Sequence, residues 1–285
     1  MHRHRSKIIT LLLALAAVVL LAACGSSDDD NTSTAASGAA SSDLGKPLKV
    51  GASPVPHAEI LNFVKQNLAP AAGLKLDIVE FTDYVQPNVQ LSEGQLDANF
   101  FQHKPYLDDF NASKGTKLTF VTPVHLEPLG LYSKKITSVS ALAGGATVAV
   151  PNDATNLGRA LKLLADNGLV KLKDGVGTAA TERDVVDNPK KLQFKPLEAA
   201  QLPRSLEDVD AAVINGNYAI EAGLKPASQA LVLEKTEGNP YVNGLVVKAG
   251  HEKDANIVTL GKLLQDQKVK DFIKQKYEGS VLPAE

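Results

Sequence analysis

The feature that most constrains the fold is an alternation of strand-like and helix-like segments from residue 48 to the C-terminus. Residues 48–52 and 146–150 are apolar runs typical of buried strands, whereas residues 56–68 and 157–167 carry apolar side chains at helical spacing. This alternation predicts an α/β protein with largely parallel sheets. It runs through two cycles, so we expect two lobes with a ligand cleft between them.

Composition excludes several classes of protein. The 285 residues hold 30 Lys and Arg against 32 Asp and Glu, a net charge of −2, which excludes a basic nucleic-acid binder. A single cysteine excludes an intramolecular disulfide framework and a cysteine-based zinc cluster. Neither a G-x-S-x-G motif nor a nucleophile with a visible base occurs, so we predict neither an enzyme nor a cofactor.

The N-terminus carries an export signal. A basic start at residues 3–7 precedes the apolar run 8–23, which is shorter than the ~20 residues of a membrane-spanning helix. The run ends in Leu-Ala-Ala-Cys, which resembles a bacterial lipoprotein signal, in which Cys24 becomes the lipidated first residue of the mature protein. An ordinary signal peptide with a chance cysteine, or an uncleaved anchor, is the alternative.

Residues 25–43 consist only of small and polar residues and cannot form a core. We therefore assign residues 1–23 to a signal peptide and residues 24–45 to the lipidated cysteine and a flexible tether.

Arg159 is in an unusual place for a cation, because it lies in the first turn of a predicted helix, where the helix dipole is positive. An external anion held by the free N–H groups and the guanidinium would explain this position. An ion pair with a neighbouring acid such as Asp153 would explain it equally well. The sequence around Arg159 is compatible with an external anion and with an ion pair to Asp153.

Two other patterns suggest a binding site. Residues 100–106 concentrate aromatic side chains in a chain with only 5% of them, which indicates either an apolar pocket with polar tips or ordinary core packing. Asn215 and Asn243 lie next to predicted strands. Asparagine there is usually a turn residue, but its amide can also pair with both ends of a zwitterion.

The histidines leave a metal site open. No two of those in the body are three or four residues apart, so there is no local metal motif. His57, His103 and His125 could still converge in the cleft and bind zinc with a carboxylate. A nearby Arg159 would oppose a bound cation.

Several motifs now combine. Besides the lipoprotein signal they are Val-Gly-Ala at 50–52, FFQHKPY at 100–106, HLEPLGLYS at 125–133, Pro-Asn-Asp at 151–153 with Asn156 and Arg159, NGNYA at 215–219 and NPYVN at 239–243. Together they resemble the NlpA/MetQ family, the methionine-binding lipoproteins of ABC importers.

The resemblance implies a two-lobed periplasmic-binding-protein fold, type II-like, with a ligand cleft and two hinge crossings near residues 124–128 and 231–233. Lobe 1 would comprise residues 46–123 and 233–285, and lobe 2 residues 124–232.

The resemblance also implies the ligand and its contacts. Tyr84, Phe101 and His103 would surround the thioether of L-methionine, Asn156 and Arg159 would hold its carboxylate, and Asn215 and Asn243 its ammonium and carboxylate groups. Sulfur–aromatic contacts are favourable by about 0.3–1.5 kcal/mol, which fits.

The expected partners are an ABC permease with its ATPase and, through palmitate or another acyl chain on Cys24, the extracytoplasmic face of the cell membrane. The alternatives are a metal-ion-binding lipoprotein that uses His57, His103 and His125, or a binding protein for another amino acid or a methionine dipeptide.

Overall fold

The computed structural model describes residues 45–285, which all belong to one compact unit, Ala40–Glu285. The predicted signal peptide, Cys24 and nearly all of the predicted tether lie outside the described residues. None of the helices in the described part has the length and hydrophobicity that crossing a bilayer requires.

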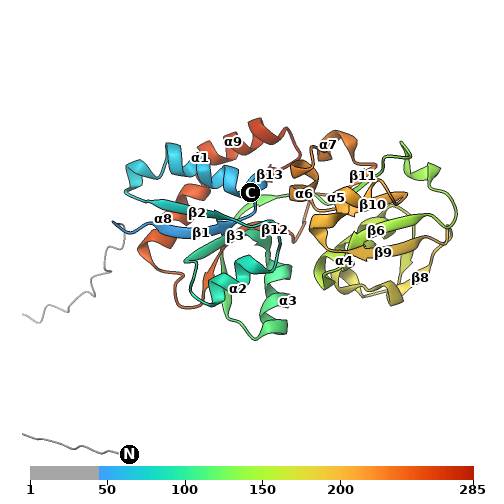
Figure 1. Cartoon of the computed structure of the whole chain (residues 1–285), viewed down its shortest axis with the longest axis horizontal. Coiled ribbons are helices and arrows are strands. Elements are labelled where there is room, and N and C mark those ends of the chain that lie inside the picture. The colour runs from blue at the N-terminus through green and yellow to red at the C-terminus, as the bar shows by residue number, and fades with distance from the viewer. Residues whose placement is uncertain (1–44) are drawn as a thin grey trace, which may run out of the picture. The chain divides into compact units, whose positions relative to one another are not determined.

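Two sheets organise these residues, and we call each sheet with its helices a lobe (Figure 1). The first sheet has the order β13–β4–β12–β3–β1–β2. Its strands are β1 (Leu48–Ala52), β2 (Leu76–Glu80), β3 (Ala98–His103), β4 (Leu118–Leu126), β12 (Val242–Lys248) and β13 (Leu282–Pro283). Its helices are α1 (Glu59–Asn67), α2 (Gln86–Ser92), α3 (Lys104–Lys114), α8 (Ala255–Leu264) and α9 (Gln267–Tyr277).

Helices cover both faces of the first sheet, as period-two alternation along β12 requires. Leu245 and Val247 pack into a core with α1, α8 and α9. Val246, between them, packs into a second core with α2 and α3. Figure 1 shows α1 and α9 above this sheet and α2 and α3 below it.

The second sheet has the order β11–β5–β10–β6–β9. Its strands are β5 (Gly130–Tyr132), β6 (Thr147–Pro151), β9 (Gln193–Leu197), β10 (Ala211–Ile214) and β11 (Val232–Leu233), and a separate pair consists of β7 (Lys171–Leu172) and β8 (Val185–Asp187). The helices of this lobe are α4 (Ala154–Asp166), α5 (Leu202–Ser205), α6 (Gly216–Glu221) and α7 (Pro226–Gln229).

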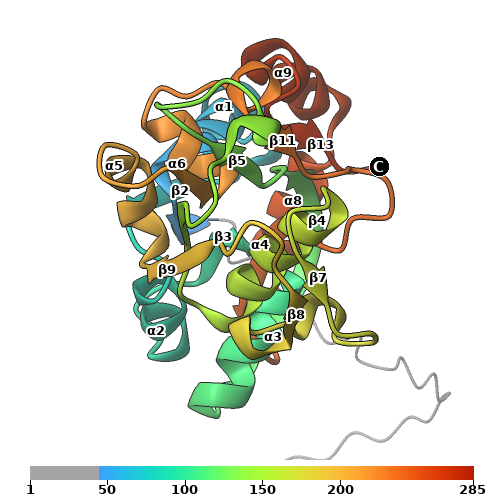
Figure 2. The same cartoon turned by 90° about the vertical axis from the view of Figure 1, so that its right-hand side faces the viewer.

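The second sheet is also covered on both faces. Val148 and Val150 of β6 pack with α4, whereas Ala149 packs on the opposite face with α5 and α6. Figure 2, in which this lobe faces the viewer, shows α4 on one side of the sheet and α5 and α6 on the other.

The expectation of largely parallel sheets is wrong, because both sheets are mixed. β1 pairs in parallel with β2 and β3, and β6 with β9 and β10. β12 is antiparallel to β3 and β4, and β5 is antiparallel to β10 and β11. β4, β5, β11 and β12 are the strands through which the described chain leaves or re-enters a lobe, at residues 127–129 and 234–241, and the C-terminal β13 is also antiparallel to β4.

Helix α4 begins three residues earlier than its apolar spacing suggests, because Asp153 caps it. The Asp153 carboxylate accepts a hydrogen bond from the backbone N–H of Asn156 at 2.9 Å and further bonds from the Asn156 side-chain amide. The cap therefore fixes both the start of the helix and the direction of the Asn156 side chain.

We expect Gly158→Ala to destabilise the fold. A Cβ atom at this position in α4 would lie 2.1 Å from the carbonyl oxygen of Thr178. The usual helical gain of alanine over glycine, about 0.5–1 kcal/mol, is smaller than the about 1–3 kcal/mol that overpacking costs. Urea unfolding of soluble residues 44–285 should therefore give a lower midpoint.

Gly144→Ala is the matched control. Its added Cβ would meet its nearest neighbour, the Lys190 carbonyl oxygen, at an ordinary 3.8 Å. Equal unfolding midpoints for the two alanine variants would contradict the close packing of α4 against residues 177–179.

Candidate functional site

The candidate site is a small pocket between the two sheets, lined by residues of both lobes. It is lined by Tyr84, Phe101, Gln102, His103, Tyr106, Glu127, Asn156, Arg159, Asn215, Gly216, Asn217 and Asn243. All seven residues that the sequence analysis assigned to the ligand are among them, so the structure brings that set together. The sequence analysis gave no role to Tyr106, Glu127 and Asn217, although each lies inside a motif that it quoted.

Aromatic side chains form one wall. The ring centroid of Tyr84 lies 6.0 Å from Phe101 and 5.8 Å from Tyr106. The Tyr84 hydroxyl donates to Asn217 Oδ1 at 2.5 Å, and the Tyr218 hydroxyl donates to the Thr82 carbonyl at 2.9 Å. These two bonds join the lobes at the rim of the aromatic wall.

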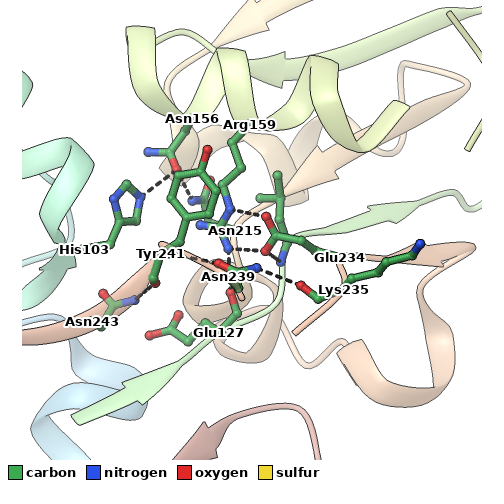
Figure 3. Close-up of polar contacts among 11 residues, drawn as sticks. His103, Glu127, Asn156, Arg159, Asn215, Glu234, Lys235, Asn239, Tyr241 and Asn243 are labelled. Carbon is green, nitrogen blue, oxygen red and sulfur yellow. Dashed lines mark hydrogen bonds and ion pairs between the residues drawn. The ribbon is translucent and has the colours of Figure 1, made fainter. Parts of the chain in front are cut away.

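Polar side chains of α4 and its neighbours form the opposite wall (Figure 3). Asn156 Oδ1 accepts from His103 Nε2 at 3.2 Å and from Asn215 Nδ2 at 3.0 Å. His103 Nδ1 accepts from the backbone N–H of Tyr106 at 3.1 Å, so both ring nitrogens are used. Burial, with the positive charge of Arg159, lowers the pKa of His103 to about 3 and keeps its ring neutral.

Arg159 is held by both segments that connect the lobes. Its Nε and Nη2 donate to the Glu234 carboxylate at 2.8 and 2.5 Å, and Nη2 also donates to the Glu127 carbonyl at 2.9 Å (Figure 3). The guanidinium carbon lies 4.2 Å from the centroid of the Tyr241 ring. None of these bonds uses Nη1.

This geometry corrects one alternative for Arg159. Asp153 is not its partner, because the Asp153 carboxylate caps α4. The anion that offsets the cation is Glu234, which is 75 residues away in sequence and adjacent only in the fold.

Two buried amide atoms at the pocket have no hydrogen-bond partner among the described residues: Asn215 Oδ1 and Asn217 Nδ2. One is an acceptor and the other a donor. Unmet buried polar atoms are costly, and an amino acid could satisfy both, since its ammonium donates and its carboxylate accepts.

The structure does not bring His57, His103 and His125 together as a metal trio. His57 and His125 lie with Glu127, whereas His103 is bonded to Asn156 in the polar wall at α4. His57 Nε2 lies 3.2 Å and His125 Nε2 lies 2.7 Å from Glu127 Oε1.

We expect the buried histidines to make the fold sensitive to acid. Burial lowers the pKa of His57 to about 4 and the pKa values of His103 and His125 to about 3. Unfolded histidine has a pKa of about 6.5, so the unfolded chain takes up protons first, and stability is complete above this pH and falls below it. Each proton contributes up to about 1.4 kcal/mol per pH unit. Burial raises the pKa of Glu127, which partly offsets the loss.

Urea unfolding at pH 7, 6 and 5 would measure this slope. His103→Gln should make it shallower by about one proton. Unfolding midpoints that stay constant across this range would contradict the neutral buried state of the three rings.

Comparison of the sequence with known proteins identifies the family of the chain. A family model described as NlpA lipoprotein matches residues 48–285. The D-methionine-binding lipoprotein MetQ of Escherichia coli (strain K12) is 43% identical over 237 residues, which cover 82% of this chain and 87% of that protein.

Solved structures agree. A nutrient binding protein from Burkholderia cenocepacia, determined bound to methionine, superposes with a TM-score of 0.81 at 44% identity and covers 84% of this chain and 100% of its own. Lipoprotein Tp32 from Treponema pallidum has a TM-score of 0.80 at 40% identity, with 84% and 100% covered. The chain thus has the two-lobed periplasmic-binding-protein fold and belongs to the NlpA lipoprotein family.

Proposed function

We propose that this chain is an extracytoplasmic solute-binding lipoprotein that captures L-methionine in the pocket between its lobes and delivers it to an ABC permease and its ATPase. The observation that carries the proposal is the pair of unpartnered amide atoms, Asn215 Oδ1 and Asn217 Nδ2, between an aromatic wall and the Arg159 guanidinium. A small apolar zwitterion matches all three features. The E. coli relative is named for D-methionine and the B. cenocepacia structure for bound methionine, so they support methionine as the ligand, and the choice of the L form is our proposal.

Each part of the pocket has a role in this proposal. Tyr84, Phe101 and the ring of His103 surround the thioether, because polarizable sulfur packs favourably against aromatic rings. Arg159 directs its remaining donor, Nη1, to the carboxylate, and Asn156 supports this end of the ligand. Asn215 and Asn243 bind the ammonium and carboxylate groups.

Capture requires motion of the lobes, and we propose the two lobes as the moving bodies, with the hinge in residues 127–129 and 234–241. The bounds expected from the sequence, 46–123 with 233–285 and 124–232, shift slightly, because β4 continues to Leu126 in the first sheet and Leu233 belongs to β11 of the second. Arg159 bonds to Glu127 and Glu234, one from each connecting segment. A ligand carboxylate that binds Arg159 therefore contacts a side chain bonded to both connecting segments. Ligand binding in this way shifts the equilibrium between open and closed lobes toward the closed form.

We also propose that Cys24 carries palmitate or a related acyl chain, that this anchors the body to the extracytoplasmic face of the cell membrane, and that the protein catalyses no reaction. The family's description as lipoproteins supports the anchor, and the binding proteins among the named relatives support a role in capture.

The function is tested by titrating residues 44–285, unfolded and refolded to remove carried-over ligand, with L-methionine, D-methionine, glycyl-methionine and other amino acids in a calorimeter. We expect selective binding of L-methionine with a Kd below about 1 μM, equivalent to about 8 kcal/mol. Heat from another amino acid and none from methionine would contradict the proposed ligand and keep the pocket.

Arg159→Ala should weaken L-methionine binding about 10- to 150-fold, because charged hydrogen bonds contribute about 1.5–3 kcal/mol. Lys162→Ala is the matched control: it lies one turn further along α4, is half exposed and pairs with Asp166. Unchanged affinity in the Arg159 variant by calorimetry would rule out its role at the carboxylate.

A further inference from the structure

A second polar cluster lies next to the pocket, and the proposed capture of an amino acid does not use its two imidazoles. His57 belongs to the helical turn Pro54–Ala58, His125 to the end of β4, and Glu127 to the first segment between the lobes. Their exposed fractions are 1%, 0% and 5%. The ring of Phe100 packs edge-on against both imidazoles, with centroids 4.8 and 5.2 Å away.

Four potential ligand atoms converge in this cluster. His57 Nε2 lies 3.2 Å from Glu127 Oε1 and 3.3 Å from Asn243 Oδ1, and His125 Nε2 lies 2.7 Å from the same Glu127 oxygen. In a tetrahedral zinc site with bonds of about 2.0–2.2 Å, neighbouring ligand atoms are about 3.3–3.5 Å apart. The 3.2 and 3.3 Å contacts already have nearly this spacing, and the 2.7 Å contact has to open by about 0.7 Å. The ligand atoms of His57, His125 and Glu127 all lie within 4.8 Å of one another, so an ion has to draw the widest pair together.

The chemistry of the donors fits a borderline transition metal. Two imidazoles and a carboxylate are a usual zinc set, and an amide oxygen is an acceptable fourth ligand. Burial lowers the pKa values of both rings, so they are neutral at pH 7 and present lone pairs without first losing a proton.

The local charge also allows a cation. The nearest positive group that the cluster senses is Arg159, and Glu234 pairs with it at 2.5 Å. A bound cation would stabilise the ionised form of Glu127, whose pKa burial raises.

We propose that His57, His125 and Glu127 form a buried transition-metal site, with Asn243 Oδ1 as the fourth ligand and Zn²⁺ as the ion that fits best. Asn243 also lines the amino-acid pocket, so the metal would share one ligand residue with the proposed amino-acid site.

The test uses the untagged, full-length protein purified from membranes in detergent and freed of metal with a chelator. Titration with Co²⁺ should produce the visible absorption of tetrahedral cobalt, and one equivalent of Zn²⁺ should remove it. His57→Gln and His125→Gln should weaken zinc binding, measured against a chromophoric chelator, at least about 10-fold, since even changes outside the ligand shell cost this much.

His251→Gln is the matched control, because His251 is an exposed histidine that pairs with Asp254 and follows the end of β12 opposite to Asn243. It should keep the wild-type zinc affinity. Absence of a tetrahedral cobalt spectrum in the folded wild type, or equal zinc affinity in all three variants, would overturn the proposal.

Two measurements keep the test decisive. If the glutamine variants do not fold, as judged by circular dichroism, X-ray absorption of the zinc-loaded wild type has to show imidazole nitrogens at about 2.0–2.1 Å. A methionine titration of the same metal-free sample separates the two proposals, because failure to bind methionine would sink the capture function and leave the metal result standing.

Discussion

The pocket depends on one interaction, the ion pair between Arg159 and Glu234. The cation is the sixth residue of α4, in the second turn and not in the first turn that the sequence suggested, because Asp153 starts the helix earlier. The anion belongs to the second segment between the lobes. Removing either partner would leave a charge in a place that is almost fully buried, which is far more costly than the pair itself. Because Arg159 also bonds to the Glu127 carbonyl, this pair connects both crossings of the described chain and a wall of the pocket.

Local sequence predicted the parts of the structure that depend on local physics. The apolar spacing along α4 was readable because it reports burial of one helix face, and the apolar run of β6 was readable because that strand is buried on both faces of its sheet. The resemblance supplied the seven pocket residues, and the structure places all of them around one cavity. Whether they bind methionine stays a prediction.

Long-range relationships escaped the sequence analysis. β12 pairs antiparallel with β3 and β4, more than 110 residues earlier, and no local pattern encodes the direction of that pairing. The partner of Arg159 was equally hidden, because the nearby Asp153 was the visible candidate and its carboxylate serves the helix cap. His103 was grouped with His57 and His125 by residue type alone. In the structure its Nδ1 accepts the capping bond from Tyr106, and its Nε2 therefore faces Asn156 in the polar wall at α4. Asn217 stood in a quoted motif, but only its unpartnered Nδ2 shows that it differs from a turn asparagine.

The two walls of the pocket differ in how tightly they are built into the rest of the molecule. Arg159 bonds to the hinge, Asn156 bonds to the α4 cap, and Asn215 bonds to Asn156, so a change in any of them spreads into the scaffold. Phe101 contributes only a ring, which touches other rings and carries no bond between the lobes. An engineer who wanted a sensor for a different amino acid would therefore vary the shape of the side-chain compartment at Phe101 and leave the backbone-recognition end alone. Ligand selectivity and closure of the lobes therefore depend on largely different residues. Tyr84 belongs to both groups, because its ring lies in the aromatic wall and its hydroxyl bonds to Asn217 of the other lobe.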